Sequence, residues 1–300
     1  MREYKQILIP ADEIKLIRGP SIILPHTIVA SRPELMEKYG FETNDPKIGV
    51  RAFTIQRANG SRNVYIEAAP GITAIDCKWT QENSYPTGDP LEAFRYTKND
   101  EDYYTTKNGA SVKLSTFGLV IGIDPTEGRE LGYTFTLLAE KRGRHQQQRG
   151  TISLPNQGYE VKWTRDGAPI DRIPITTDDF RKAIHYDSAS TLLIDENHII
   201  GYSDIGLGIM PGSIDAGGMV VVEIDHRELE RDYKKSREEA DEDPENTWKI
   251  PLIVRTRELK DFLYSHENVN SLLSEESLGQ LFNDNDTFDR CYKNALKSNK

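Results

Sequence analysis

Residues 111–138 read SVKLSTFGLVIGIDPTEGRELGYTFTLL. Large apolar residues alternate with small or hydroxyl residues on both sides of a polar turn at residues 124–129. This period of two is typical of β-strands, in which successive side chains point to opposite faces. The pattern predicts an antiparallel hairpin with one wide apolar face, made of Phe117, Leu119, Ile121, Ile123, Leu131, Tyr133, Phe135 and Leu137.

Strand-like segments rich in Val, Ile, Tyr and Thr surround this hairpin over residues 1–225. A second hairpin is expected around Pro70 and Gly71, followed by an alternating strand at residues 75–79 that carries Cys77. Residues 80–109 are polar and are expected to form a long excursion, residues 177–185 a short capped helix, and residues 219–224 a strand buried on both faces. The whole predicts an α+β fold built on a large, mainly antiparallel sheet or sandwich.

Residues 226–300 differ in character, because they are mostly helical in pattern and acidic. Asp225 and Glu228 fit a capping box that opens a charged helix to about residue 240. We expect a linker at residues 241–249, an edge strand at 250–254, and short helices at 257–264, 275–282 and 287–296. The last helix has an apolar stripe that must dock on this chain or on a partner, made of Phe288, Cys291, Tyr292 and Leu296. The expected division is therefore a β-rich domain, 1–225, and a helical region, 226–300.

Composition narrows the class of protein. The 300 residues carry a formal net charge of −10, and both predicted regions are acidic, so nucleic acid is not expected as a partner. There is no apolar run long enough for a membrane helix, and the first residues do not resemble a secretory signal. We therefore expect a cytoplasmic protein whose two cysteines are reduced, with no metal and no cofactor.

Two sets of residues could carry chemistry. Pro211-Gly212-Ser213-Ile214-Asp215 resembles one motif of the dUTPase and dCTP deaminase family, which implies that Asp215 contacts a deoxyribose and that Glu223 serves deamination. The arginine-containing phosphate step of that family is missing before Gly206. His226, with Asn246 and His266 downstream, is compatible with a metal-dependent nuclease of the His-finger type.

The remaining hypotheses concern surfaces. Lys141, Arg142, Arg144 and Arg149 form the densest basic segment, expected as a hairpin loop that could contact phosphate or anionic lipid. A sheet-rich part, an acidic linker and a helical tail resemble a gasdermin in layout, which implies a latent pore-forming effector with an inhibitory tail that meets a membrane after activation. We favour a non-catalytic protein that acts by self-assembly, as a homo-oligomer, or by binding a protein partner or a membrane surface.

Overall fold

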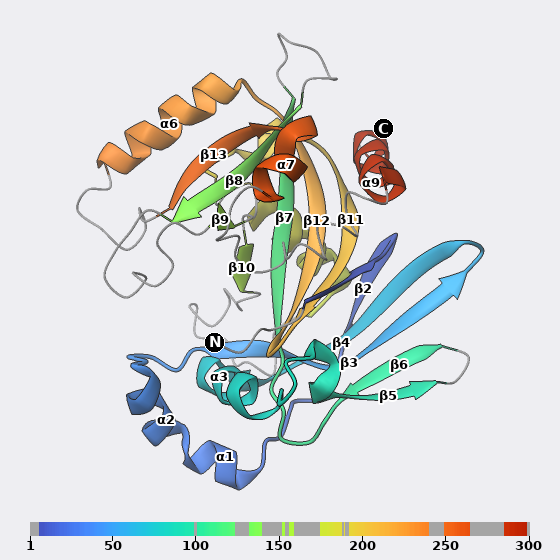
Figure 1. Ribbon diagram of the computed structural model, residues 1–300, viewed down its shortest axis with the longest axis vertical. Helices are drawn as coiled ribbons and strands as arrows, with labels where there is room; N and C mark the ends of the chain where they lie inside the picture. The colour runs from blue at the N-terminus through green and yellow to red at the C-terminus, as the bar shows by residue number, and fades with distance from the viewer. Residues whose placement is uncertain are drawn as a thin grey trace. The chain divides into compact units, whose positions relative to one another are not determined.

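The computed structural model describes residues 6–98, 101–123, 132–139, 152–153, 156–158, 175–187, 189, 192–239, 249–264 and 285–298. Its strands join in a 13-stranded, mostly antiparallel sheet in which β2 and β4 run parallel, and helices accompany the sheet (Figure 1). The predicted α+β fold with a mainly antiparallel sheet is confirmed. No helix in the described ranges has the length and apolar character needed to cross a bilayer.

The chain divides into two compact units. Unit 1 comprises residues 1–116, 157–183 and 206–216, and unit 2 comprises residues 117–156, 184–205 and 217–300. The C-terminal region thus belongs to unit 2 together with earlier strands, and the units do not divide at residue 225 as the sequence indicated. Four strands have residues in both units: β7 (Lys113–Ile123), β10 (Asn156–Gly158), β11 (Ile199–Met210) and β12 (Ser213–Glu223).

Unit 1 is built on a long hairpin, β3 (Pro46–Ala58) and β4 (Ser61–Thr73). Its turn is Asn59-Gly60, both with positive φ, which is the geometry of a two-residue hairpin loop. The hairpin predicted at Pro70 and Gly71 is wrong, because β4 continues through both residues. The other elements of the unit are β1 (Ile7–Pro10), β2 (Glu13–Arg18), α1 (His26–Ala30), α2 (Arg32–Tyr39), α3 (Ala74–Asn83), η1 (Pro90–Ala93), β5 (Phe94–Lys98), β6 (Asp102–Thr106) and α4 (Thr177–Lys182).

Residues 75–79 form part of helix α3, not the predicted strand, and residues 80–109 contain η1, β5 and β6 instead of an irregular excursion. The predicted helix at residue 177 is confirmed as α4, with Thr176 accepting a hydrogen bond from the backbone N–H of Asp179. This helix also covers β2: the Thr177 hydroxyl accepts from the Leu16 N–H at 3.0 Å and donates to the Leu16 carbonyl at 3.2 Å. The N–H and C=O groups of Leu16 thus form hydrogen bonds with a helix side chain instead of with another strand.

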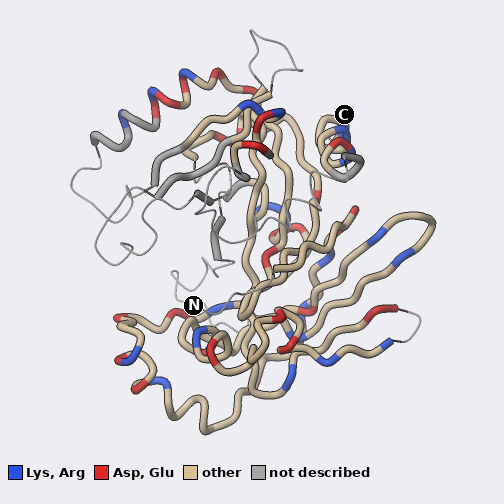
Figure 2. The backbone as a smooth tube through the Cα atoms, viewed as in Figure 1, with Lys and Arg blue, Asp and Glu red and all other residues tan. Residues whose placement is uncertain are grey.

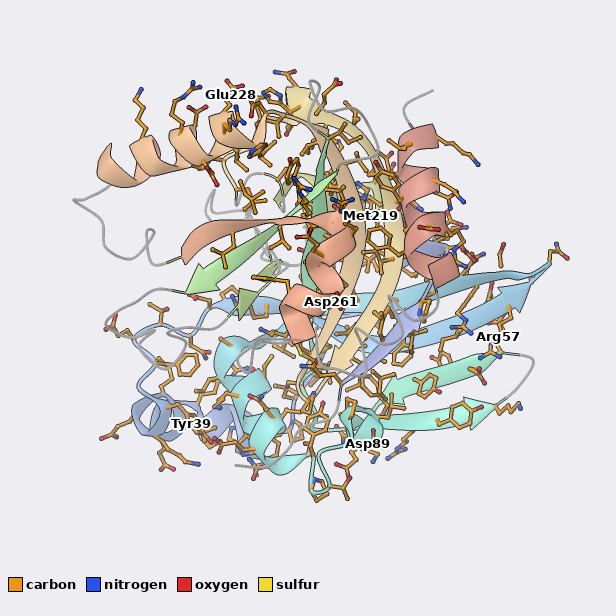
Figure 3. All side chains as sticks on the ribbon, turned by 45° about the horizontal axis from the view of Figure 1, so that its top comes forward. Tyr39, Arg57, Asp89, Met219, Glu228 and Asp261 are labelled. Carbon is orange, nitrogen blue, oxygen red and sulfur yellow. The ribbon has the colours of Figure 1, made fainter. Side chains whose placement is uncertain are left out.

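Unit 2 contains β8 (Tyr133–Ala139), β9 (Ile152–Ser153), η6 (Glu196–His198), α6 (His226–Glu239), β13 (Lys249–Arg255), η7 (Thr256–Glu258), α7 (Leu259–Tyr264) and α9 (Asn285–Lys297). A π-helical turn, η5 (Ala183–Asp187), follows α4. The predicted strand at residues 192–194 is wrong, since these residues form a turn before η6. Acidic and basic residues follow one another along α6, as its sequence predicted (Figure 2), and Glu228 on this helix is exposed (Figure 3).

The hairpin of β7 and β8 exists, but its register differs from the prediction. Ile121 pairs with Thr134, and Gly122 pairs with Tyr133. Directly paired residues share a face of the sheet, so the odd-numbered apolar residues of β7 and Tyr133 lie on opposite faces. Phe135 pairs with Val120 and is likewise out of step with Phe117. Phe117, Leu119, Ile121 and Ile123 are all buried, as are the residues between them, so the single apolar face expected of this pair does not form.

The C-terminal segments pack within unit 2. β13 pairs along its whole length with β8, which confirms the predicted strand, and Pro251 lies within it. Helix α9 contacts β11: the Ser203 hydroxyl donates to the Cys291 carbonyl at 2.8 Å, and a Cβ on Gly201 would lie 1.9 Å from the Ala295 carbonyl oxygen. Cys291 is buried, while Phe288, Tyr292 and Leu296 are half-buried, so the predicted stripe docks on this chain. The predicted helix at 275–282 lies outside the described residues.

Candidate functional site: a cationic pocket in unit 1

A pocket with a volume of about 550 Å³ opens in unit 1. This volume falls in the range of small-molecule sites. We call it the cationic pocket, because the described residues that line it include three cations and no carboxylate. The lining residues are 20–24, Val50, Arg51, Arg95 and 105–110.

A β-bulge places Arg51 at this pocket. The register of β3 against β4 shifts between Val50 and Ala52, so Arg51 is an extra residue in the strand. Bulges of this kind bend a strand and redirect a side chain. One guanidinium nitrogen of Arg51 donates to the Pro20 carbonyl at 2.8 Å, and Nε lies 3.5 Å from a carboxylate oxygen of Glu67. Arg51 therefore ties the first wall of the pocket to the sheet, with the carboxylate of Glu67 beside its guanidinium.

The second and third cations come from the β5–β6 hairpin and the loop after it. Arg95 pairs with Thr105 across the hairpin, and its side chain is exposed. Lys107 is held by its backbone N–H, which donates to the Ala93 carbonyl at 2.8 Å, and by its ammonium group, which donates to the Glu92 carbonyl at 2.5 Å. No ion pair of Arg95 or Lys107 occurs within the described part of the chain. Both charges are thus available to a ligand.

The wall formed by residues 20–24 is held against β4 by backbone contact. The Ile22 N–H donates to the Pro70 carbonyl at 2.8 Å. At Gly71, where φ is +120°, a Cβ would lie 2.3 Å from the Ile22 carbonyl oxygen, so only glycine allows this crossing. The glycine that the sequence analysis assigned to a turn therefore serves a close approach of two backbones.

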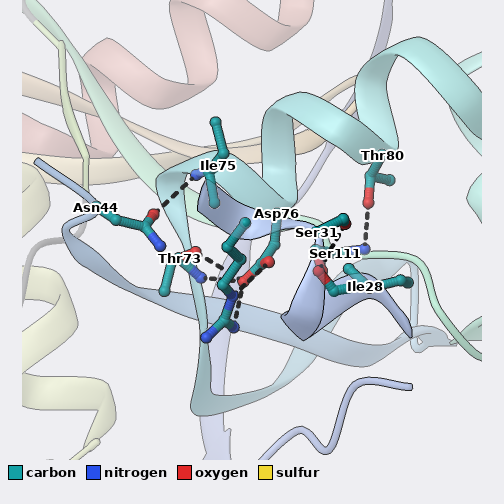
Figure 4. Close-up of polar contacts among 9 residues, drawn as sticks. Ile28, Ser31, Asn44, Thr73, Ile75, Asp76, Thr80 and Ser111 are labelled. Atoms are coloured by element: carbon teal, nitrogen blue, oxygen red, sulfur yellow. Dashed lines mark hydrogen bonds and ion pairs between the residues drawn. The ribbon is translucent and has the colours of Figure 1, made fainter. Parts of the chain in front are cut away.

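Helix α2, which follows that wall, is tied to α3 through the buried carboxylate of Asp76, which Figure 4 shows beside Thr73. Asp76 on α3 is fully buried and accepts two hydrogen bonds from the Arg32 guanidinium, at 3.0 and 2.8 Å. The same carboxylate accepts from the Thr73 N–H at 2.8 Å and from the Thr73 hydroxyl at 2.7 Å, completing the capping box of α3. Asp76 therefore joins α2, α3 and the end of β4.

The residues predicted to be catalytic are not brought together. Asp215 and Glu223 lie eight residues apart in the same strand, β12, which is roughly 26 Å at the rise of an extended strand. Asp215 is 3% exposed and accepts a hydrogen bond from the Ser213 hydroxyl at 2.6 Å, within its own strand β12. Burial raises the pKa of Asp215, against the opposing effect of the Ser213 hydrogen bond. The carboxyl of Asp215 is therefore withdrawn from solvent in this conformation.

His226 is the first residue of helix α6. Its ring lies 4.6 Å from the Tyr133 ring, and Nδ1 lies 3.9 Å from a carboxylate oxygen of Asp225. Asp225 caps α6 by accepting from the Arg227 N–H at 2.8 Å. Within the described ranges, no three His, Cys, Asp or Glu residues are grouped so that they could hold a metal ion. Asn246 and His266 lie outside those ranges.

The basic segment of Lys141, Arg142, Arg144 and Arg149 also lies outside the described residues, as does Leu131. Cys77 is buried, and burial raises the pKa of its thiol to about 12, so it is not an activated nucleophile.

Sequence reasoning missed Arg51, Arg95 and Lys107. Each stands alone in its own segment, so no local motif marks it. The signals that could have contributed are Asn59-Gly60, which fixes the β3–β4 hairpin, and Thr73-x-x-Asp76, which is a capping-box pattern.

Comparison with known proteins adds little. The sequence matches no protein family, and no curated protein is significantly similar to it. Among solved structures, the chain is similar to the crystal structure of a mutT/nudix family protein from Listeria innocua. The TM-score is 0.29 with 9% sequence identity, and the similarity covers 49% of this chain and 81% of that one. A similarity this distant carries no argument about function.

Proposed function

We propose that this protein acts by binding, without catalysis, and that unit 1 captures an anionic ligand in the cationic pocket. The observation that carries the proposal is the lining itself, which includes Arg51, Arg95 and Lys107 and no carboxylate among its described residues. The chain carries a net charge of −10, so a pocket lined by three cations and no described carboxylate has a charge opposite to that of the chain as a whole.

Charge-assisted hydrogen bonds from guanidinium and ammonium groups are the strongest that a pocket of this kind offers. Arg95 and Lys107 are exposed, so an incoming anion does not need to displace an existing ion pair on them within the described structure. Arg51 is half-buried and anchored to Pro20, which pre-orders one donor. These features favour recognition of a small carboxylate, phosphate or sulfate group.

The test is calorimetric titration of the full chain with inorganic phosphate and with acetate at constant ionic strength. We expect saturable binding that weakens at least tenfold in the double variant R95Q/K107Q, because each lost charge-assisted bond costs about 1.5 kcal/mol or more. The matched control is Lys98→Gln, which removes an exposed cation from β5 outside the pocket. Equal weakening by the control, or no saturable binding at all, would refute the proposal.

Self-assembly remains a second proposal, favoured by the exposed edge of β5. Ala93 and Lys107 form a hydrogen-bonded pair, and such pairs alternate along an antiparallel ladder. The backbone groups of Tyr96 therefore point away from β6, where another strand could add. Arg95 and Lys98 beside it are charges of the type that protects edges from pairing, so we rank this proposal lower. Sizing chromatography with mass photometry tests it, and a monomer at all concentrations would end it.

A cytoplasmic location, a protein or membrane partner and an inhibitory tail are further proposals. Tail inhibition has one structural support, which is the docking of α9 on β11. Deletion of residues 285–300 followed by a liposome leakage assay tests it. Unchanged vesicle integrity after this deletion would remove the pore-forming hypothesis.

A further inference from the structure

We propose that the ligand of the cationic pocket is an aliphatic chain that ends in an anionic group. This inference rests on the proposed function, and it adds the chemical class of the ligand. It follows from the aliphatic side chains in the lining of the pocket, taken together with its three cations.

The apolar part of the lining is entirely aliphatic in the described residues. It consists of Pro20, Ile22, Ile23, Leu24, Val50 and Ala110. Leu24, Val50 and Ala110 are buried, so the accessible apolar surface of the lining comes from Pro20, Ile22 and Ile23. An alkyl chain gains from contact with such a surface in proportion to the area that it removes from water.

Ile23 gives the clearest indication. Its side chain is 88% exposed, the highest value among the large apolar residues of the described structure. Its neighbour Ile22 is half-buried and Leu24 is buried, whereas Ile23 lines the pocket with its side chain exposed. Among the described residues, its side chain is therefore left largely uncovered. A ligand chain that leaves the pocket would cover it.

The same lining argues against a nucleotide. A base is normally held by stacking on an aromatic or guanidinium plane. None of the described lining residues is aromatic, and Phe53, Phe94 and Tyr104 pack against one another outside the lining. The guanidinium of Arg51 is occupied by Pro20 and Glu67, and the exposed guanidinium of Arg95 is assigned to the anionic group of the ligand. An alkyl carboxylate or alkyl phosphate therefore fits the walls better than a nucleoside phosphate.

The experiment is a chain-length series, in which acetate, butyrate, hexanoate and octanoate are titrated into the full chain by calorimetry. We expect the affinity to rise about threefold to fourfold for each added methylene until the chain fills the pocket. Octyl phosphate forms a second arm that identifies the preferred head group. Inorganic phosphate and acetate test anion binding alone, whereas the longer carboxylates test the contact with the alkyl chain. If both bind but affinity does not increase with chain length, this inference fails while the proposed function stands.

A vesicle arm separates a free ligand from a membrane source of the same chemistry. Flotation with phosphatidylcholine vesicles that contain oleate measures surface binding. Capture of soluble octanoate, with or without flotation, supports the inference. Flotation without octanoate binding would overturn it, since the basic residues would then act as a surface patch and not as a pocket.

Variants locate the alkyl chain. Ile23→Ser is expected to weaken octanoate binding threefold to tenfold and to leave acetate binding unchanged, because Ile23 lines the pocket and its exposure makes a folding defect unexpected. The matched control is Ile17→Ser, an isoleucine that is 51% exposed on β2 and outside the lining. An equal loss in both variants, or no loss in Ile23→Ser, would overturn the assignment.

Discussion

Substitution of Arg32 by alanine tests the packing that supports the pocket. Asp76 is fully buried and accepts four hydrogen bonds, two of them from Arg32. Removing Arg32 leaves a buried carboxylate with only its two bonds from Thr73. Breaking a buried ion pair on one side costs about 3 to 5 kcal/mol. The Arg32 side chain is 24% exposed, so we expect the low end of that range, about 3 kcal/mol.

Urea unfolding measures this loss. With a slope of about 3 kcal/mol/M, the midpoint should fall by about 1 M. Because the chain has two compact units, the two-state assumption needs a local readout as well. Hydrogen exchange in α3 provides one, and R32A should accelerate exchange there. The double variant R32A/D76N should be more stable than R32A, since it no longer buries an unpaired charge.

The control is Arg57→Ala on strand β3 (Figure 3). Arg57 is 66% exposed and lies 3.8 Å from Asp102, so its ion pair should contribute less than about 1 kcal/mol. If R32A were no more destabilising than R57A, or if D76N failed to restore stability to R32A, the role assigned to Asp76 would be refuted.

Three further predictions follow from buried groups and backbone contacts. Gly71→Ala should cost about 3 kcal/mol of stability in thermal unfolding, from its φ of +120° and its clash with Ile22, and should weaken anion binding; a neutral effect would contradict the crossing described. Cys77 should resist iodoacetamide at pH 8 in the folded protein and react after unfolding, because its thiol has a pKa of about 12; mass spectrometry showing rapid native labelling would contradict this. Burial raises the pKa of Asp215, so the stability from its protonated form is present below its unfolded pKa and is lost as pH rises through the folded value. D215N should therefore gain stability relative to the parent as pH rises above about 4, the ordinary pKa of an aspartate, in chemical denaturation, and a constant difference would contradict the shift.

Local patterns predicted much of the fold. The strands β7, β12 and β13 and the helices α4, α6 and α9 follow from periodicity and capping residues, which act over a few positions. Helix α3 was missed because an apparent alternation at residues 75–79 masked the capping box of Thr73 and Asp76.

The face of the β7–β8 hairpin was predicted wrongly for a different reason. A shift of one residue exchanges the two faces of a strand, and the buried pattern of β7 on both faces leaves nothing in its sequence to fix the register. The pocket was missed because its three cations come from β3, β5 and the loop after β6. Only the bulge at Arg51 and the pairing of β5 with β6 bring them into one lining, and neither leaves a local signature.

Hydrogen exchange of the full chain with and without saturating octanoate tests the central claim most directly, because it locates the ligand. We expect slower exchange in residues 20–24 and 105–110, which line the cationic pocket, with unchanged exchange in α9. This protection should disappear in R95Q/K107Q and persist in K98Q. Protection confined to other segments, or identical protection in R95Q/K107Q, would show that the anion is not held by these residues.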